Sequence, residues 1–422
     1  MNLAEMLSYA DIAQLSNIAH TYDCECSTHS KHELIQSILS AVGRRESLER
    51  RVGEMGLDDL RFLNSLLFEK RAAYSLEDLT ARAASAASGI GQSEPAEGAG
   101  AAKEAETDRP KTRAAKGRAS AKPRASKRAS AAETPPAPAD PARNAIARFK
   151  RFGWLFNGFS QQTKYLYHVP EDVKKRLCEA LDRKFRDSLE LRGEPPAYRD
   201  ERTLLSEDVT LLTRFVRDHD VPLTAEGYVY KRQLQQLLDA LSVVEPLPGK
   251  SAFRFGYGRR YREYPDRFSL LYDYCFYAGY VEELPDRLVL TEQGGAAATG
   301  AVRSDPADIY RFWMRLYKIP VPNLQALVHW VMRLSGGAWV TVASLERVLL
   351  PLIRPYYYDS ERDILERRLL RMMLHLGLLR YGETEEGEAV VCMTPQGRAL
   401  VSGNEVTFED ALPWTFASVD SG

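Results

Sequence analysis

Cysteine is scarce in this chain of 422 residues, and long apolar runs are missing from it. The cysteines are too few and too scattered for a disulfide framework, which favours a reducing, cytoplasmic compartment; they are Cys24, Cys26, Cys178, Cys275 and Cys392. No apolar stretch reaches the ~20 residues that a transmembrane helix needs. The N-terminus carries Glu5 and Asp11 and no basic cluster, so no signal peptide is predicted. We therefore expect a cytoplasmic protein without a membrane partner.

The sequence also has no marked excess of positive or negative charge. The chain has 57 Lys and Arg residues against 58 Asp and Glu residues, so any basic surface must be local. Catalytic signatures are missing too. There is no phosphate-binding Gly-x-x-x-x-Gly-Lys-Ser/Thr loop, no His-Glu-x-x-His, no Gly-x-Ser-x-Gly and no Gly-x-Gly-x-x-Gly. The sequence thus predicts a protein that is not an enzyme and needs no cofactor.

One short pattern, in contrast, occurs three times. An apolar helix end is followed by Gly and an aromatic residue or Leu, then by two short strands around a polar turn, and then by a Pro- or Thr-marked helix start. Gly is typical of helix ends, and Pro and Thr are typical of helix starts. The copies span residues 152–172, 278–292 and 376–395. In a winged helix, the recognition helix is followed directly by a β-hairpin, which is called the wing.

These patterns predict a mainly α fold with small β-hairpin wings. It would consist of tandem winged-helix modules, a small helical N-terminal head and a disordered basic insertion. Hydrophobic residues make up 44% of the chain, which suffices for ordered cores. We expect the following domains: a head at 1–50, a first winged helix split between 51–84 and 141–190, an insertion at 85–140, a second winged helix at 200–302, a third at 305–403, and a tail at 404–422.

The first winged helix is predicted to be split because the hairpin at 154–169 lacks its own preceding helices. The helices at 57–71 and 75–84 would supply them, so residues 57–84 should pack against 142–169. The intervening insertion is rich in Ala, Ser, Pro and charged residues and contains no aromatic residue, which predicts disorder.

Within the insertion, residues 111–130 contain eight basic residues and no acidic one. Such a segment can neutralise phosphates and release counterions, which gives affinity for DNA of any sequence. The alternative is a solubilising linker without a ligand. The candidate DNA-binding residues here are Lys111, Arg113, Lys116, Arg118, Lys122, Arg124, Lys127 and Arg128.

The densest run of basic and aromatic residues lies at 254–267. Arg can contact phosphates with two nitrogens, and Tyr can stack on bases. Alternatively, the tyrosines pack on the module and the arginines are solvated or pair with Glu263 and Asp266. The candidate nucleic-acid-binding residues of this loop are Arg254, Arg259, Arg260, Tyr261 and Arg262.

Part of the second module resembles a known family. The stretch Leu223-Thr224-x-x-Gly227-Tyr228-x-x-Lys231-Arg232, an amphipathic helix, Gly279-Tyr280-Val281 and Leu290-Thr291 follow one another. This arrangement is similar to a bacterial helicase-associated region that resembles the N-terminal part of XPB-type DNA helicases. The resemblance covers about 200–400. It implies a non-catalytic winged-helix array that works on or beside DNA, with Lys231 and Arg232 among its contacts.

The first forty-two residues resemble the helix–extended–helix motif of SAP domains and of the Rho N-terminal region. The match lies in Leu15, Ile18, Ala19, Tyr22, Lys31, Leu34, Ile35, Ile38 and Leu39. That family binds nucleic acid with this motif, and the resemblance implies that Lys31 faces the ligand. In the same head Cys24, Cys26, His29 and His32 are close in sequence. They could bind a metal or be ordinary loop and core residues, and we predict no metal site.

The sequence therefore predicts a non-catalytic DNA-binding protein that acts as an accessory to a helicase or repair machine and associates with the nucleoid. DNA would be its main partner, and a helicase or another protein a second one. The main alternative is a winged-helix scaffold for protein–protein interactions. A weaker alternative is a cryptic enzyme of nucleic-acid repair.

Overall fold

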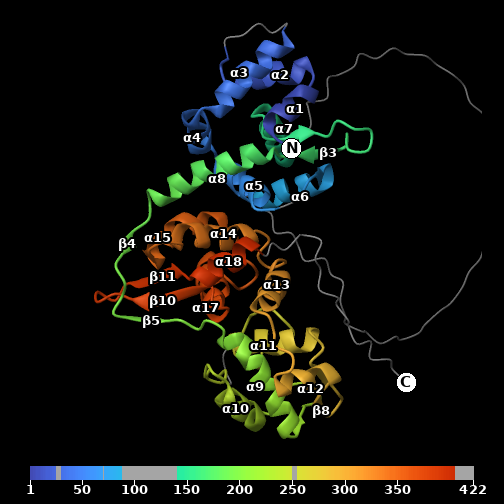
Figure 1. Cartoon of the computed structure of the whole chain (residues 1–422), viewed down its shortest axis with the longest axis vertical. Helices are drawn as coiled ribbons and strands as arrows, with labels where there is room; N and C mark the ends of the chain where they lie inside the picture. Colours follow the sequence, from blue (N-terminus) through green and yellow to red (C-terminus); the bar gives the residue numbers. More distant parts are fainter. Residues whose placement is uncertain (25–29, 70, 88–139, 250–253, 404–422) are drawn as a thin grey trace, which may run out of the picture. The chain divides into compact units, whose positions relative to one another are not determined.

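The fold is mainly helical, with 57% helix and 11% strand, and its strands form small antiparallel sheets (Figure 1). This confirms the predicted class at that level. The structure is a computed structural model, and it describes residues 1–24, 30–69, 71–87, 140–249 and 254–403. Residues 1–87 and 141–422 belong to one unit and Ser88–Asp140 to a second. Most of the predicted insertion and the whole predicted tail lie outside the described residues.

Three groups of elements share one order: a helix, a short strand, two helices and two strands. The first group consists of α5 (Leu57–Leu67), β1 (Tyr74–Ser75), α6 (Leu76–Ala86), α7 (Pro141–Arg151), β2 (Phe156–Asn157) and β3 (Leu166–His168). Its sheet has the order β1-β3-β2, so the first strand pairs with the last. Tyr74 lies opposite Tyr167, and Phe156 lies opposite His168.

The second and third groups repeat this topology. The second consists of α9 (Leu204–Asp218), β6 (Val221–Pro222), α10 (Lys231–Ala240), α11 (Asp266–Tyr277), β7 (Val281–Glu283) and β8 (Arg287–Leu290). The third consists of α14 (Leu324–Ser335), β9 (Trp339–Thr341), α15 (Val342–Leu349), a helix made of α16 (Glu361–Asp363), η2 (Ile364–Leu370) and α17 (Arg371–His375), β10 (Leu379–Glu383) and β11 (Ala389–Met393). In both, the first strand again pairs with the last, and β4 (Leu191–Arg192) and β5 (Ala197–Arg199) extend the third sheet at its two edges.

The glycine of each repeated pattern ends its helix in the same way. Gly153, Gly279 and Gly377 have φ angles of 66°, 70° and 69°, a conformation that glycine adopts at little cost. In each case the next amide donates to the carbonyl five residues earlier, for example Trp154 N to Phe149 O at 3.0 Å. These bonds satisfy carbonyls that the helix end leaves open. The chain then turns directly into the hairpin, as the pattern predicts.

The remaining elements surround these groups. Four short helices form the N-terminal region, α1 (Leu3–Tyr9), α2 (Ile12–Thr21), α3 (Lys31–Gly43) and α4 (Arg45–Glu54). The helices that follow the three hairpins are α8 (Glu171–Arg186), α12 (Glu292–Thr299) and α18 (Pro395–Gly403). Helix α13 (Pro306–Tyr317) precedes the third group, and η1 (Leu350–Leu352) follows α15. Within the described residues, none of the helices is both long and apolar enough to span a membrane.

The expected packing of residues 57–84 against 142–169 is confirmed. Helix α6 packs on α7, and β1 pairs with β3. The rings of Phe62 on α5 and Phe149 on α7 lie 4.8 Å apart, and Arg148 forms an ion pair with Asp59. Elements on both sides of residues 88–139 therefore share one core. The assignment of these elements to separate domains stays a prediction.

Candidate nucleic-acid interface

Helix α7 has one buried and one exposed face. Its apolar residues Ala142, Ala145, Ile146 and Phe149 are buried in the core, because they recur at helical spacing. Arg143, Asn144, Ala147 and Arg151 are exposed on the other side. The last turn therefore brings basic side chains to the surface directly before the β2–β3 hairpin.

Two basic residues, Lys150 and Arg151, lie at the C-terminal end of α7. Lys150 Nζ donates to Asn157 Oδ1 on β2 at 2.8 Å and lies 5.7 Å from the centre of the Tyr167 ring on β3. Arg151 is exposed. Among the described residues, neither cation forms an ion pair with a carboxylate, so both charges are available to an anion.

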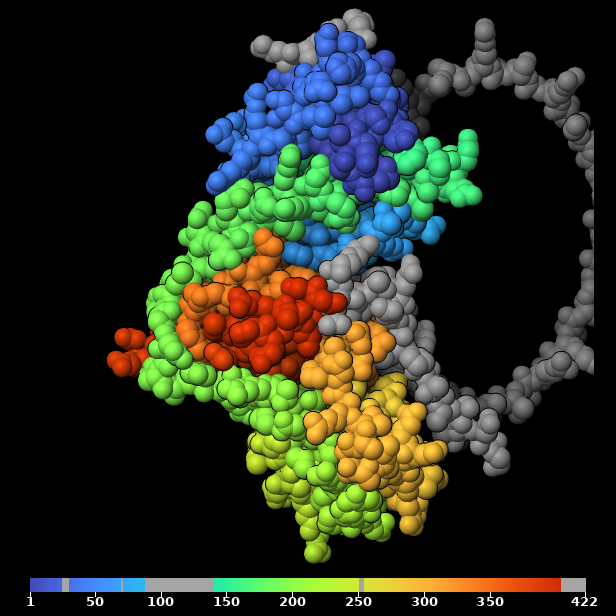
Figure 2. All heavy atoms as spheres, in the orientation of Figure 1, coloured from blue at the N-terminus to red at the C-terminus, as the bar shows by residue number. Residues whose placement is uncertain are grey.

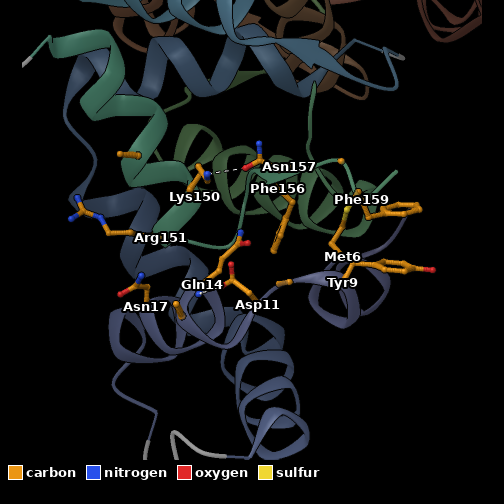
Figure 3. A pocket seen from close by; sticks show the side chains of 14 residues that line it. Met6, Tyr9, Asp11, Gln14, Asn17, Lys150, Arg151, Phe156, Asn157 and Phe159 are labelled. Atoms are coloured by element: carbon orange, nitrogen blue, oxygen red, sulfur yellow. Dashed lines mark hydrogen bonds between the residues drawn. The ribbon is translucent and has the colours of Figure 1, made fainter. Parts of the chain in front are cut away.

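A cavity of about 660 Å³ lies beside these cations. Its walls come from α1, α2, α7 and the start of the hairpin, and include Tyr9, Asp11, Gln14, Asn17, Lys150 and Arg151 (Figure 3). The Nε2 atom of Gln14 is buried and has no hydrogen-bond partner among the described residues. Buried polar groups are normally hydrogen-bonded. This wall therefore combines positive charge with an amide donor that a ligand could satisfy.

Two aromatic rings stack at the edge of the cavity (Figure 3). Tyr9 ends α1, and Phe159 lies in the hairpin turn; their ring centres are 4.1 Å apart and their planes differ by 10°. Both are exposed, at 61% and 50%. The hairpin projects from the surface beside the N-terminal helices (Figure 2). Exposed rings of this kind can stack on nucleobases.

The hairpin carries a second exposed ring. Tyr165 is 73% exposed, and Lys164 Nζ lies 4.9 Å from the centre of its ring. A cation and an aromatic face are thus presented together on the projecting part of the hairpin. The same two chemical groups occur at the cavity, where Lys150 and Arg151 accompany Tyr9 and Phe159.

The helices that correspond to α7 in the other two groups present different surfaces. On α11 every residue from Arg267 to Cys275 is buried, so this helix has no open face for a ligand. On the third helix Arg362 pairs with Glu346, and Arg367 and Arg368 pair with Asp266. Arg371 on the third helix is exposed as well, but α7 differs in that its two cations, Lys150 and Arg151, adjoin a hairpin that carries exposed aromatic rings.

The arginines of the 254–267 loop are held by carboxylates. Arg259 and Arg260 both pair with Glu283, at 3.0 and 2.7 Å. Burial acts to raise the pKa of Glu283, but the hydrogen bond from Arg260 and the charge of Arg259 lower it overall. Arg254 pairs with Asp266 at 3.0 Å. The structure thus shows pairing with Asp266, as the alternative interpretation expected, and with Glu283 rather than Glu263.

The other residues of this loop differ in exposure. Tyr261 is half-buried and lies near Phe255, with ring centres 6.3 Å apart, whereas Arg262 is exposed. Contact of Arg254, Arg259, Arg260, Tyr261 and Arg262 with nucleic acid stays a prediction. The ion pairs mean that DNA would have to compete with Glu283 and Asp266 for three of the four arginines.

The remaining predicted residues that the structure describes, Lys31, Lys231 and Arg232, do not line the cavity beside α7. Lys31 is exposed, and its Nζ donates to Ser8 O at 2.8 Å. Lys231 and Arg232 are exposed at the start of α10. The eight basic residues from Lys111 to Arg128 lie outside the described residues, as do Cys26 and His29. Among the residues that the structure does describe, no group of His, Cys, Asp and Glu could hold a metal ion.

Comparison of this chain with protein-family models, curated proteins and solved structures finds no match.

The sequence reasoning missed Tyr9, Lys150, Arg151, Phe159 and Tyr165 as binding residues. The sequence did contain one indication for Phe159. The turn at 157–163 is polar except for this residue, and an aromatic ring in a polar turn is not expected to pack into a core. Tyr9 carried no such signal, because its stacking on Phe159 joins residues 150 positions apart.

Proposed function

We propose that the three repeated groups are winged helices and that the first binds DNA without catalysis. Helix α7 would act as its recognition helix and the β2–β3 hairpin as its wing. The observation that carries the proposal is the open basic end of α7, where two cations that meet no carboxylate in the described part of the chain adjoin stacked, exposed rings. The shared topology, with the first strand paired to the last, supports the winged-helix assignment.

The proposed mechanism combines two kinds of contact. Lys150, Arg151 and Lys164 would neutralise phosphates and so position the protein on any sequence. Tyr9, Phe159 and Tyr165 would stack on bases that are unpaired. The basic residues 111–130 would add further phosphate contacts, since only ten residues, 131–140, separate them from the first residue of α7.

This proposal places the first group ahead of the 254–267 loop as the DNA-binding site. The second and third groups would then position the protein beside its partner, which agrees with the resemblance of 200–400 to a helicase-associated region. We propose a helicase or repair machine as the context and the nucleoid as the location.

Replacing both Lys150 and Arg151 by Gln should weaken binding to a DNA duplex and flatten its dependence on salt. Each lost phosphate contact reduces the slope of log K against log salt by about 0.9, so the double variant should lose about 1.8. Fluorescence anisotropy with a labelled 20-base-pair duplex at several salt concentrations measures this slope. The matched control is Lys175→Gln with Arg303→Gln, which removes the same charge from exposed positions elsewhere.

The control variant should retain the wild-type slope. An unchanged slope in the Lys150 and Arg151 variant would refute the α7 site. Failure of the wild-type protein to bind duplex or single-stranded DNA even at low salt would refute DNA binding and favour the protein-interaction scaffold.

Phe159→Ala should weaken binding to single-stranded DNA more than binding to a duplex. A base stacked on an aromatic ring contributes about 1–3 kcal/mol, which corresponds to a loss of about 5- to 140-fold in affinity. Anisotropy with labelled oligo(dT) and with the duplex gives the two affinities. Tyr358→Ala is the control, since Tyr358 is equally aromatic and 69% exposed but lies in another loop. Equal losses on both forms of DNA would rule out stacking by Phe159.

A further inference from the structure

The interior of the cavity beside Tyr9 has no part in the contacts proposed so far, which use the cations and the rings at its edge. Its volume of about 660 Å³ falls within the ~300–1,000 Å³ that is usual for ligand pockets. Small residues keep the space open, since Ala10, Ala13, Ala147 and Gly158 are part of the lining. The cavity can therefore hold a group larger than a phosphate.

The two ends of this cavity differ in chemistry (Figure 3). Lys150 and the amide of Gln14 lie toward one end, and the stacked rings of Tyr9 and Phe159 lie toward the other. Phe156 lies between the two ends and is almost fully buried, so it belongs to the floor of the cavity. A cationic end suits a phosphate, and an apolar floor suits a flat ring. A nucleotide combines these two groups.

Gln14 has a side-chain atom without a partner. Its backbone N–H donates to Asp11 Oδ1 at 2.6 Å, but its side-chain Nε2 is buried and meets no hydrogen-bond partner among the described residues. Rotation of the side-chain amide by half a turn exchanges Nε2 with Oε1, so the amide can present a donor or an acceptor to the cavity. Bases that leave the stack are recognised by hydrogen bonds to their Watson–Crick edge. Gln14 is suited to such a contact with any base.

The charged residues of the lining favour a single anionic group. Lys150 and Arg151 are the two cations of the lining, and Asp11 is its one acidic residue. The Asp11 carboxylate caps α2, where the helix N-terminus stabilises negative charge. A phosphate can therefore lie against Lys150 and Arg151 although Asp11 lines the same cavity.

We infer that this cavity takes one unpaired nucleotide that adjoins duplex DNA. The phosphate would lie against Lys150 and Arg151, the base would lie on Phe156, and the edge of the base would meet Gln14. The duplex beside this nucleotide would contact α7, because both cations belong to the last turn of that helix. This role rests on the proposed DNA binding and specifies the form of DNA that the site prefers.

Fluorescence anisotropy of the full chain with three labelled duplexes tests this preference. The first duplex is fully paired, the second has one extra nucleotide as a central bulge, and the third has an abasic residue in place of that nucleotide. The abasic bulge keeps the extra phosphate and the flexible backbone but has no base. We expect the bulged duplex to bind at least about fivefold more tightly than either of the other two, because only its base can stack and pair in the cavity.

Two variants locate the contact with the base. Gln14→Leu removes the amide, and Ala13→Leu narrows the cavity from α2. Each should weaken binding of the bulged duplex by about three- to tenfold and leave binding of the paired duplex unchanged. Gln14→Leu should not lower the melting temperature, because the lost nitrogen has no partner in the described part of the chain. Gln36→Leu is the matched control, since Gln36 is exposed on α3 and does not line the cavity.

The outcomes separate this role from DNA binding in general. Failure of the wild-type protein to bind any of the duplexes would refute the proposed function itself. Equal affinity for the bulged and the paired duplex would overturn only the preference for an unpaired nucleotide. A preference that the abasic bulge shares, or that both variants retain, would come from the flexible DNA backbone and would overturn it as well.

A free nucleotide has the same chemistry as an unpaired nucleotide in DNA. Isothermal titration calorimetry with the four deoxynucleoside 5′-monophosphates distinguishes the two sources. We expect these to bind much more weakly than the bulged duplex, because they lack the duplex that would contact α7. Binding of a monophosphate that is as tight as that of the bulged duplex and is lost in Gln14→Leu would assign the cavity to a free nucleotide and overturn the assignment to DNA.

Discussion

Replacing Arg267 by Met should lower the free energy of unfolding by about 3–5 kcal/mol. Arg267 is fully buried on α11, and its partners are almost as inaccessible. Its Nε lies 3.3 Å from Glu201 Oε2, and its Nη1 lies 2.6 Å from Asp208 Oδ2. Without Arg267, two buried carboxylates would lose their shared counter-ion.

Glu201 connects this ion pair to its surroundings, and it also pairs with Arg199 at 2.7 Å. Burial acts to raise its pKa, but the hydrogen bond and charge of His375 together with the charge of Arg267 lower it overall. His375 Nδ1 lies 3.0 Å from Glu201 Oε2, so the network joins the second and third groups of elements. Among the described residues, Asp208 forms its ion pair with Arg267 alone. Removing one partner from such a buried pair leaves an uncompensated charge, which costs more than the pair itself contributes.

Urea unfolding followed by tryptophan fluorescence measures the effect. Arg217→Met is the matched control, because Arg217 is exposed and pairs with its exposed neighbour Asp218. Such a surface pair contributes about 0–1 kcal/mol. A loss in Arg267→Met no larger than in Arg217→Met would show that the buried network does not stabilise the fold.

Gly377→Ala should be far more destabilising than Gly279→Ala, although both glycines end a helix with nearly the same φ, 69° and 70°. A Cβ atom on Gly377 would lie 1.9 Å from the backbone oxygen of Arg202, whereas the nearest atom to a Cβ on Gly279 is a side-chain oxygen of Gln293 at 3.6 Å. Side chains can rotate away, but a backbone carbonyl in a packed segment cannot.

Comparing Gly279→Ala with Gly377→Ala separates the cost of the left-handed backbone conformation from the cost of a steric clash of the new Cβ atom. The left-handed conformation alone costs a non-glycine residue about 1–2 kcal/mol, and we expect that loss for Gly279→Ala. For Gly377→Ala we expect more than about 4 kcal/mol or a failure to fold. Thermal and urea unfolding of both variants measure the difference. Similar losses of stability in the two variants would mean that the segment around Arg202 moves away from the new Cβ atom without a loss of free energy.

The sequence by itself determined the mainly helical class, the three helix ends and the hairpins that follow them. It could do so because these features are local: a glycine directly after an apolar helical segment is a typical helix end, and the residues that follow it have the composition of a strand. The packing of residues 57–84 against 142–169 was also predictable, because the hairpin at 154–169 needed preceding helices. Short elements such as α1, α4, β4 and β5 were missed, since two to ten residues carry little periodic signal.

Only the tertiary structure decided which basic residues are open to a ligand. In the sequence, the run at 254–267 has more Arg and Tyr than the end of α7. In the fold, Glu283 lies against Arg259 and Arg260, Arg267 is buried, and Lys150 and Arg151 meet no carboxylate among the described residues. The charge of a side chain follows from the residue type, but whether that charge is open to a ligand depends on neighbours that are distant in sequence. For the same reason the stacked pair of Tyr9 and Phe159 exists only once the N-terminal helices and the hairpin are folded together.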